Sequence, residues 1–303
     1  MIEILRAGQC DLVMDLGRPG HGALGVPAGG AADPGALAAA NRLVGNDEAE
    51  AGLEMTLTGP SLRFPEGGVV ALTGAHFEAT SGSGTAVAWN ETLVLAAGET
   101  LSLGRALAGC RCWMAFRGGL ALPRVMNSRS TFLPAGFGGL RGRALRTGDM
   151  LAVGAITGEV RRLRAQPLPD ARGASLRVVA GPQSARFDDS GLAAFFTGRF
   201  RVSGASDRRG LRLSGPVLSH ARIDLPSQGV LPGAVQVPPD GQPIILGWDG
   251  PVTGGYPVIA GVVAADWPRL AQLRPGDEVS FATIDIETAW ALAAARWKIE
   301  ESG

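Results

Sequence analysis

The sequence predicts a mainly β fold with a few short helices, built as two β-barrel-like domains. Many short segments alternate apolar and polar residues, and each one closes on Gly, Pro, Asp or Ser. The 45 glycines and 20 prolines are spread along all 303 residues, which indicates many tight turns and not one disordered tail. Hydrophobic residues make up 46% of the chain and charged residues 18%, a composition typical of globular proteins, and the length allows two domains.

The expected strands are short and lie in both halves of the chain. They are the alternating segments at 3–8, 61–64, 68–74, 92–104, 110–116, 149–154, 175–181, 199–204, 211–218, 242–248, 256–266 and 277–284. The segment 161–174 is charged, contains proline and has no apolar periodicity. It is the expected linker between an N-terminal β-rich domain, 1–165, and a C-terminal barrel domain, 175–303.

Helical signals are fewer, and the clearest of them lies at 33–46. There Asp33 is expected to be the N-cap, Pro34 the first helical residue, and Gly45 the left-handed stop. Further helices are expected at 188–198, 265–273 and 287–301.

The last expected helix has a helical spacing of small and aromatic residues that predicts one face packed on a sheet, formed by Ala289, Trp290, Ala293 and Trp297. We therefore expect both tryptophans to be core residues and not ligand-stacking groups.

Several classes of protein are disfavoured by composition. The three cysteines form no even framework, the N-terminus is not typical of a signal peptide, and no run of 18 apolar residues exists. We expect a cytoplasmic protein without a membrane partner. A pI near 6.8 and 6% aromatic residues argue against nucleic-acid binding. The three histidines are scattered, so no metal site is expected.

Positive charge is segregated in the middle of the chain. Eight arginines and no acidic residue lie between Thr100 and Gly148: Arg105, Arg111, Arg117, Arg124, Arg129, Arg141, Arg143 and Arg146. The acid-rich stretch 45–54 is one possible internal partner, and an anionic ligand is the other. Arg129 stands out because it lies between Ser128 and Ser130 in the stretch "SRST", where hydroxyls and a guanidinium can share one oxyanion.

Three polar stretches of the C-terminal half have the composition of a small-ligand site. They lie at 206–213, 227–243 and 247–257, and they combine rigid Pro/Gly loops with amides and carboxylates. Composition alone does not separate such a site from the ordinary rim of a β-barrel.

These segments, together with "DLGRPGHGALGVPAGGAADPGALAAANRLVGNDEAEAGLEMTLTGPSLRF", "SRSTFLPAGFGGLRGRALRTGD", "GAVQVPPDGQPI" and "TGGYPVIAGV", strongly resemble the KipA family. That family comprises the C subunit of the bacterial ATP-dependent 5-oxoprolinase and the related carboxyltransferase portion of urea carboxylase. The match runs in order from about residue 10 to residue 285. The resemblance implies a mainly β structure whose C-terminal domain is cyclophilin-like.

The resemblance also implies work in a complex. A protein of this kind acts with a KipI-like B subunit and the A subunit of 5-oxoprolinase, and together they couple ATP hydrolysis to the opening of 5-oxoproline, giving glutamate. We expect ATP to be bound by the complex and not necessarily by this chain. Lys298 is the only lysine, so we expect no covalent biotin on this chain.

Site residues follow from the matched segments. The expected catalytic residues are Arg129, Asp207 and Asp249, and no metal ligands are expected. The expected substrate- or anion-binding residues are Ser128, Ser130, Thr131, Arg208, Gln236, Asp240, Gln242, Thr253, Gly254, Gly255 and Tyr256. Arginine and hydroxyl donors suit a developing negative charge, and Asp207, Asp240 or Asp249 suits the substrate nitrogen or a metal-bound phosphate.

The chain departs from the family pattern at three places. Asn127 replaces a glycine, Gln228 replaces a glutamate, and Gly250–Val252 replaces an Arg-Gln-Thr stretch. Two alternatives to the oxoprolinase component therefore stay open. One is a biotin-dependent carboxyltransferase component acting on a urea-like amide, and the other is a non-catalytic regulator that antagonises a KipI-like protein.

Overall fold

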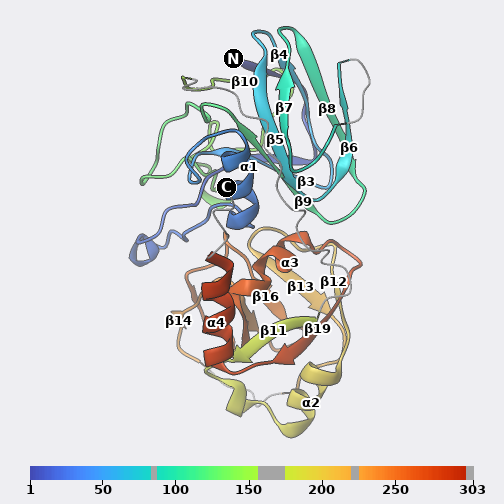
Figure 1. The fold of residues 1–303 in the computed structure, drawn as a ribbon. Coiled ribbons are helices and arrows are strands. Elements are labelled where there is room, and N and C mark those ends of the chain that lie inside the picture. Colours follow the sequence, from blue (N-terminus) through green and yellow to red (C-terminus); the bar gives the residue numbers. More distant parts are fainter. Residues whose placement is uncertain (83–86, 156–174, 220–224, 298–303) are drawn as a thin grey trace. The chain divides into compact units, whose positions relative to one another are not determined.

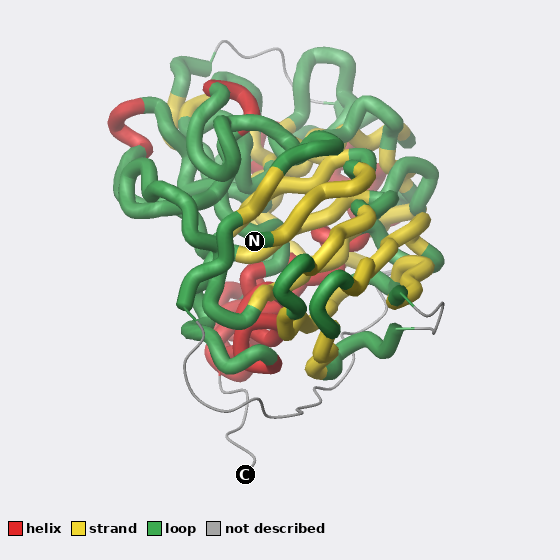
Figure 2. Tube along the Cα trace, turned by 90° about the horizontal axis from the view of Figure 1, so that it is seen from above, coloured by secondary structure: helices red, strands yellow, loops and turns green. Residues whose placement is uncertain are grey.

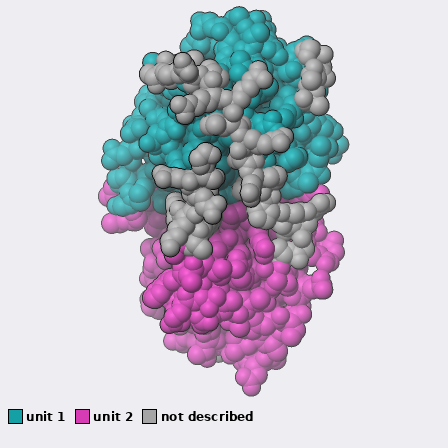
Figure 3. All heavy atoms as spheres, viewed as in Figure 1, with its two compact units in different colours: residues 1–21, 28–170 teal, residues 22–27, 171–303 magenta. Residues whose placement is uncertain are grey.

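The computed structural model describes residues 1–82, 87–155, 175–219 and 225–297. The chain divides into two compact units. The first unit comprises residues 1–21 and 28–170, and the second comprises 22–27 and 171–303 (Figure 3). The predicted linker, 161–174, lies outside the described residues.

The first unit contains two five-stranded sheets, where the sequence predicts a barrel-like domain. One sheet has the order β10 (Met150–Leu151), β1 (Ile2–Arg6), β4 (Ser61–Phe64), β8 (Glu99–Ala106), β6 (Phe77–Ser81). The other has the order β2 (Cys10–Met14), β3 (Gly52–Thr56), β9 (Arg111–Phe116), β5 (Gly68–Gly74), β7 (Thr92–Leu95). All the pairings in both sheets are antiparallel.

Alternation along these strands builds one core between the two sheets. Alternate residues of β4, such as Leu62 and Phe64, and of β9, such as Met114 and Phe116, belong to the same buried cluster. The opposite face of β5 and β9 is covered by helix α1 (Pro34–Leu43). A strand with both faces covered needs few polar residues, and all six residues of β9 are buried.

The second unit contains a closed seven-stranded barrel (Figure 1). Its strand order is β11 (Ser175–Ala180), β18 (Val258–Val262), β15 (Ala234–Gln236), β16 (Ile244–Leu246), β13 (Gly210–Ser214), β12 (Phe200–Val202), β19 (Glu278–Thr283). The parallel pairing of β19 with β11 closes the ring. A separate ribbon pairs β14 (Gln228–Gly229) with β17 (Thr253–Gly254).

Figure 2 shows that strands and loops make up most of the described chain and that the helices are short, which confirms the predicted fold class. The α-helices of the second unit are α2 (Asp189–Thr197), α3 (Trp267–Gln272) and α4 (Ile286–Trp297). Short 3-10 turns are η1 (Gly22–Leu24), η2 (Leu133–Ala135), η3 (Ser184–Arg186) and η4 (Ala264–Asp266). No helix in the described ranges is long and apolar enough to cross a membrane.

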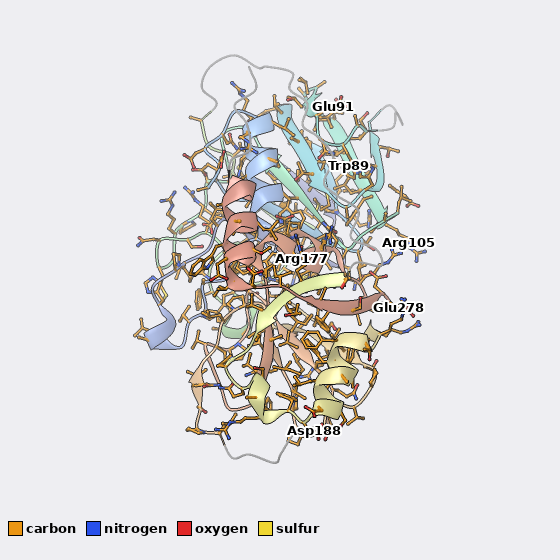
Figure 4. The ribbon with its side chains drawn as sticks, turned by 60° about the horizontal axis from the view of Figure 1, so that its bottom comes forward. Trp89, Glu91, Arg105, Arg177, Asp188 and Glu278 are labelled. Carbon is orange, nitrogen blue, oxygen red and sulfur yellow. The ribbon has the colours of Figure 1, made fainter. Side chains whose placement is uncertain are left out.

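Capping residues begin and end α1 as predicted. Asp33 accepts hydrogen bonds from the amides of Gly35 and Ala36, and Gly45 has a φ of 75° just past α1. Asp188 caps α2 (Figure 4), and its hydrogen bonds with the hydroxyls of Ser190 and Ser219 lower its pKa to about 2.

Arg177 and Asp266 anchor the barrel to the turn that follows β18. The guanidinium of Arg177 on β11 (Figure 4) donates to both carboxylate oxygens of the fully buried Asp266 in η4. The main-chain amide of Arg177 adds a hydrogen bond of 2.7 Å to the same carboxylate.

The predicted core position of Trp290 is wrong. Its side chain is 66% exposed. The half-buried face of α4 is formed by Ala289, Leu292 and Ala293, and Trp290 lies about 100° around the helix from Ala289. The side chain of Trp297 lies outside the described residues.

Candidate functional site

The predicted site residues fall into two groups, one in each unit. In the first unit, the stretch Asn127–Thr131 begins inside a tight turn, residues 125–128. Two main-chain hydrogen bonds close this turn, Val125 N to Ser128 O (2.8 Å) and Ser128 N to Val125 O (3.2 Å). The residues at its tip, Met126 and Asn127, have φ values of 52° and 64°. Asparagine tolerates this left-handed region better than other non-glycine residues. Asn127 can therefore form this turn at the position where the resemblance implies a glycine.

Asp15 is the centre of the polar network in this loop. Its carboxylate Oδ1 accepts hydrogen bonds from the hydroxyls of Ser128 and Ser130, both at 2.6 Å, and from the amide of Gly17 at 2.8 Å. Its Oδ2 accepts from the amide of Arg129 at 2.5 Å. Asp15 is 7% exposed, and both serines are fully buried. The predicted hydroxyl donors are thus engaged with an internal carboxylate.

Thr131 and Arg129 are held from different sides. The amide and hydroxyl of Thr131 both donate to the carbonyl of Val13, at 2.9 Å and 3.1 Å. Arg129 Nε donates to the carbonyl of Leu122 at 2.9 Å, and Nη1 forms an ion pair with Glu50 Oε2 at 3.1 Å. The Arg129 side chain is 19% exposed, so it keeps access to solvent that the serines lack.

The glycines after this stretch allow close approach of neighbouring backbone. A Cβ at Gly138, where φ is 71°, would lie 2.1 Å from the carbonyl oxygen of Ser130. Arg18, which is 1% exposed, donates from Nη2 to that same carbonyl, and its guanidinium carbon lies 4.9 Å from the Phe137 ring centroid. Glycine is therefore needed here for packing.

Four of the eight arginines between Thr100 and Gly148 have partners inside the first unit. Arg129 pairs with Glu50 and Arg111 with Glu54, which confirms that the acid-rich stretch 45–54 supplies internal partners. Arg143 forms a two-point contact with Asp149, and the Arg117 guanidinium donates to a main-chain carbonyl. The exposed members of these eight are Arg105, Arg124, Arg141 and Arg146.

In the second unit, Arg208 and Asp249 form a buried ion pair. Arg208 Nε donates to Asp249 Oδ2 at 2.8 Å and Nη2 to Oδ1 at 3.3 Å, and the two side chains are 8% and 1% exposed. The Asp249 amide also donates to the Arg208 carbonyl at 3.1 Å. This pair joins the loop before β13 to the loop after β16.

Asp207, Asp240 and Gln242 stabilise turns. Asp207 Oδ1 accepts from the amide of Arg209 at 2.7 Å, and Asp240 Oδ1 accepts from the amide of Gln242 at 3.0 Å. The Gln242 amide group exchanges two hydrogen bonds with the main chain of Gly215. Of these contacts, the one between Asp240 and Gln242 joins two predicted site residues.

Gln236 and Gly254 are brought together at the β14–β17 ribbon. A Cβ at Gly254 would lie 2.6 Å from Gln236 Nε2. Gln236 is 4% exposed, whereas Thr253 is exposed and Tyr256 is 45% exposed. Gly255 is half-buried between them. Gln236 is thus buried on β15, whereas the predicted site residues at 253–256 are exposed or half-buried.

Comparison with known proteins identifies the family. A family model described as the carboxyltransferase domain, subdomains A and B, matches residues 24–283. The chain belongs to this carboxyltransferase-domain family. It is 40% identical to the C subunit of 5-oxoprolinase from Escherichia coli (strain K12) over 291 residues, which cover 95% of this chain and 93% of that protein. The resemblance drawn from the sequence is confirmed.

The urea amidolyases are also similar, but they are much longer. The chain is 31% identical to Saccharomyces cerevisiae urea amidolyase over 313 residues, covering 96% of this chain and 17% of that protein. The crystal structure of Kluyveromyces lactis urea amidolyase superposes with a TM-score of 0.91 and 31% identity, covering 98% of this chain and 19% of that one.

Sequence reasoning missed three residues of the polar networks in this carboxyltransferase-family chain: Asp15 and Arg18 contact predicted site residues, and Gln183 contacts Gln228. Asp15, Arg18 and Gln183 make long-range contacts, such as the one between Asp15 and Ser128, which lie 113 positions apart. The available signal for Asp15 was an acidic residue directly after an apolar run and before two glycines in "DLGRPG".

This chain also has a buried carboxylate outside the predicted site. Asp11 on β2 is 1% exposed; Oδ2 accepts a hydrogen bond from the Gly8 amide at 2.5 Å, and Oδ1 has no hydrogen-bond partner among the described residues. Burial raises the pKa of this carboxyl to about 6. Between about pH 4 and pH 6 the folded state therefore binds a proton that the unfolded state has released, and stability falls as pH rises through this window.

We expect Asp11→Asn to stabilise the protein at pH 7–8 by roughly 2–3 kcal/mol, because it removes the cost of a buried charge. The gain should shrink below pH 6 and vanish near pH 4. Urea denaturation across this pH range measures it. Asp149→Asn is the opposite-sign control, because the hydrogen bonds from Arg143 lower the pKa of Asp149. A gain for Asp11→Asn that does not change with pH would contradict the assignment.

Proposed function

We propose that this chain is the C subunit of an ATP-dependent 5-oxoprolinase complex that converts 5-oxoproline to glutamate. The observation that carries this proposal is the 40% identity along 95% of this chain and 93% of the Escherichia coli protein. The Haemophilus influenzae protein of the same name is 34% identical with the same coverage of both chains. A match along nearly the whole length of both proteins supports a shared role better than the match to about a sixth of the larger urea amidolyase.

The chemistry needs more than one component. A lactam is a poor electrophile, and transfer of a phosphoryl group from ATP to its oxygen makes the ring carbon reactive. Attack by one water on that carbon breaks the C–N bond and leaves the amine and an acyl phosphate, and a second water hydrolyses the acyl phosphate, which releases phosphate and leaves the carboxylate of glutamate. The proposed partners are a KipI-like B subunit and the A subunit of 5-oxoprolinase, with ATP bound by the complex. Donors that meet the charge on the transferred group accelerate such steps.

Arg129 is the group we propose for that task in this chain. It lies between two buried serines, its main-chain amide is fixed by Asp15, and its side chain retains partial exposure. In the complete complex, Arg129→Ala should lower turnover on the order of 10²-fold, as expected for loss of a charge-assisted transition-state contact. Steady-state phosphate release measures it.

Arg124→Ala is the matched control for this substitution. Arg124 is exposed in the same loop, and its removal should leave turnover unchanged. Turnover of Arg129→Ala within about threefold of wild type would show that Arg129 has only a structural role, through its contacts with Glu50 and Leu122, since catalytic donors of this kind contribute far more.

A second candidate is a carboxyltransferase component that accepts a carboxyl group from biotin and transfers it to a urea-like amide. The TM-score of 0.91 with a urea amidolyase favours it. This function requires a biotin carrier in trans, because Lys298 is the only lysine. Binding of a biotinylated carrier domain, without 5-oxoproline-dependent phosphate release, would favour this candidate over the first.

The test of the main proposal is phosphate release that depends on both ATP and 5-oxoproline. The complex is assembled from this chain and its two partner proteins, and each component is omitted in turn. Release that continues at the same rate without this chain would overturn the proposal.

A further inference from the structure

Three glutamine side chains lie close together at the β14–β17 ribbon of the second unit. Gln236 lies against Gly254, and Gly254 is the strand partner of Gln228. The Gln228 side-chain oxygen accepts from Gln183 Nε2 at 3.2 Å. Gln183 Oε1 accepts from the amide of Val258 at 3.0 Å, and Val258 is the strand partner of Gln236. We call Gln183, Gln228 and Gln236 the glutamine cluster.

One polar atom of this cluster has no partner in the described part of the chain. Gln236 Nε2 makes no hydrogen bond to any described residue, although Gln236 is only 4% exposed. A buried polar group without a partner costs about 1–3 kcal/mol. Native structures retain few such groups, and a bound molecule or ion is one way of completing them.

Two local features place the amide where it is. The pairing of β15 with β18 shifts register between Val235 and Gln236, and such bulges re-aim side chains at barrel rims. Gly254 has no Cβ, and one would lie 2.6 Å from Gln236 Nε2. Any larger residue at this position would push the amide aside. The bulge and the glycine together keep the Gln236 amide against the ribbon.

The ribbon is the part of the unit best able to expose that amide. Each of its strands has two residues, and Gly229 and Thr253 are exposed. Outward movement of so short a pairing breaks few hydrogen bonds. It would uncover the Gln236 amide, which lies against Gly254 of the ribbon.

We propose that the glutamine cluster binds the amide group of a small ligand, with Gln236 making the direct contact. Primary amides donate and accept at once, so they pair with the N–H and C=O of a lactam or a urea. The cluster carries no formal charge, whereas carboxylates and phosphates are recognised mainly by arginine and other charged donors. Our choice of the lactam of 5-oxoproline as the ligand rests on the proposed function. The amide class rests on the cluster alone.

The test measures ligand binding and stability on the full chain. The probes are 5-oxoproline, 2-pyrrolidone and urea, with proline as the control that keeps the ring and carboxylate but lacks the lactam carbonyl. Affinities are measured by ligand-observed NMR titration and melting temperatures by calorimetry. The variants are Gln236→Met, which keeps the size but removes both polar atoms, and Gln236→Glu, which keeps an oxygen but loses the N–H donors. Gln272→Met is the matched control, because Gln272 is another buried glutamine of the same unit, on α3.

We expect the lactams to bind and proline not to bind. Gln236→Met and Gln236→Glu should each weaken lactam binding at least tenfold, which corresponds to the loss of about one hydrogen bond. The melting temperature of Gln236→Met should be unchanged or higher, because an unpaired polar group has been removed. Gln272→Met should leave the affinity unchanged. Tighter binding of urea than of the lactams would keep the amide class and assign the cluster to urea.

Three results would overturn the proposal. They are equal binding of proline and 5-oxoproline, affinity of Gln236→Met within twofold of wild type, and no binding of any amide by the full chain. If the complex still turns over 5-oxoproline in that last case, the proposed function stands and the cluster assignment falls. If the cluster binds lactams through Gln236 and the complete complex shows no turnover, the cluster assignment stands and the proposed function falls.

Discussion

Replacing Asp15 with alanine should lower the free energy of unfolding by at least about 3 kcal/mol, because each hydrogen bond to a buried charged group contributes roughly 1.5–3 kcal/mol. The Asp15 carboxylate accepts two hydroxyl and two main-chain hydrogen bonds in a site that is 7% exposed. Without it, the hydroxyls of Ser128 and Ser130 lose their acceptor in the interior. The loop that carries Arg129 should then lose its fixed conformation.

Urea denaturation gives the stability change, and hydrogen exchange at residues 128–131 reports the loop directly. Asp15→Asn should have a smaller effect because one of its two side-chain positions still accepts. Glu66→Ala is the control, because Glu66 is an exposed acid of the same unit that pairs with the N-terminal ammonium group. A loss below about 1 kcal/mol for Asp15→Ala, the size expected for a surface position, would mean that the network does not hold the loop.

Replacing Asp249 with alanine should cost about 3–5 kcal/mol of stability, the usual consequence of leaving one member of a buried ion pair without its partner. Arg208 meets both oxygens of Asp249, and neither side chain is more than 8% exposed. The guanidinium would remain buried without this counter-charge. The loops before β13 and after β16 would also lose the contact that joins them.

A double-mutant cycle with Arg208→Met separates the pair from its surroundings. We expect strong coupling, with the double variant less destabilised than the sum of the two single changes. The exposed pair Arg201–Glu278, with side chains 62% and 48% exposed, should show coupling of less than about 1 kcal/mol in the same assay. If Asp249→Ala left stability intact and abolished turnover, Asp249 would be a catalytic carboxylate and not an anchor.

Elements with local signals could be predicted from the sequence. The helix at 33–46 carries its own N-cap, proline and terminal glycine, and α1 begins and ends beside them. The strands at 61–64 and 68–74 alternate cleanly between turns, and β4 and β5 have those same bounds. β2, β3, β6, β14, β15 and β17 were not predicted. In β2 and β3, acidic residues such as Glu54 are buried by partners that the local sequence does not reveal.

The site was predicted as a set of segments but not as a geometry. The stretch 127–131 was recognised, yet the acceptor of its hydroxyls is Asp15, more than a hundred residues earlier. Likewise, helical spacing placed Trp290 on a packed face, but which face of α4 is buried depends on tertiary contacts, and Trp290 is exposed. Local patterns determine where elements form, whereas partners between distant segments depend on the folded arrangement.

The central claim is that this chain is a necessary part of a 5-oxoproline-cleaving complex. The most direct measurement is the glutamate formed from 5-oxoproline and ATP by the assembled complex, followed with and without this chain. We predict that glutamate and phosphate appear in equal amounts with the complete set, and that glutamate falls to background when this chain is left out. Glutamate formed at the same rate in its absence would contradict the claim.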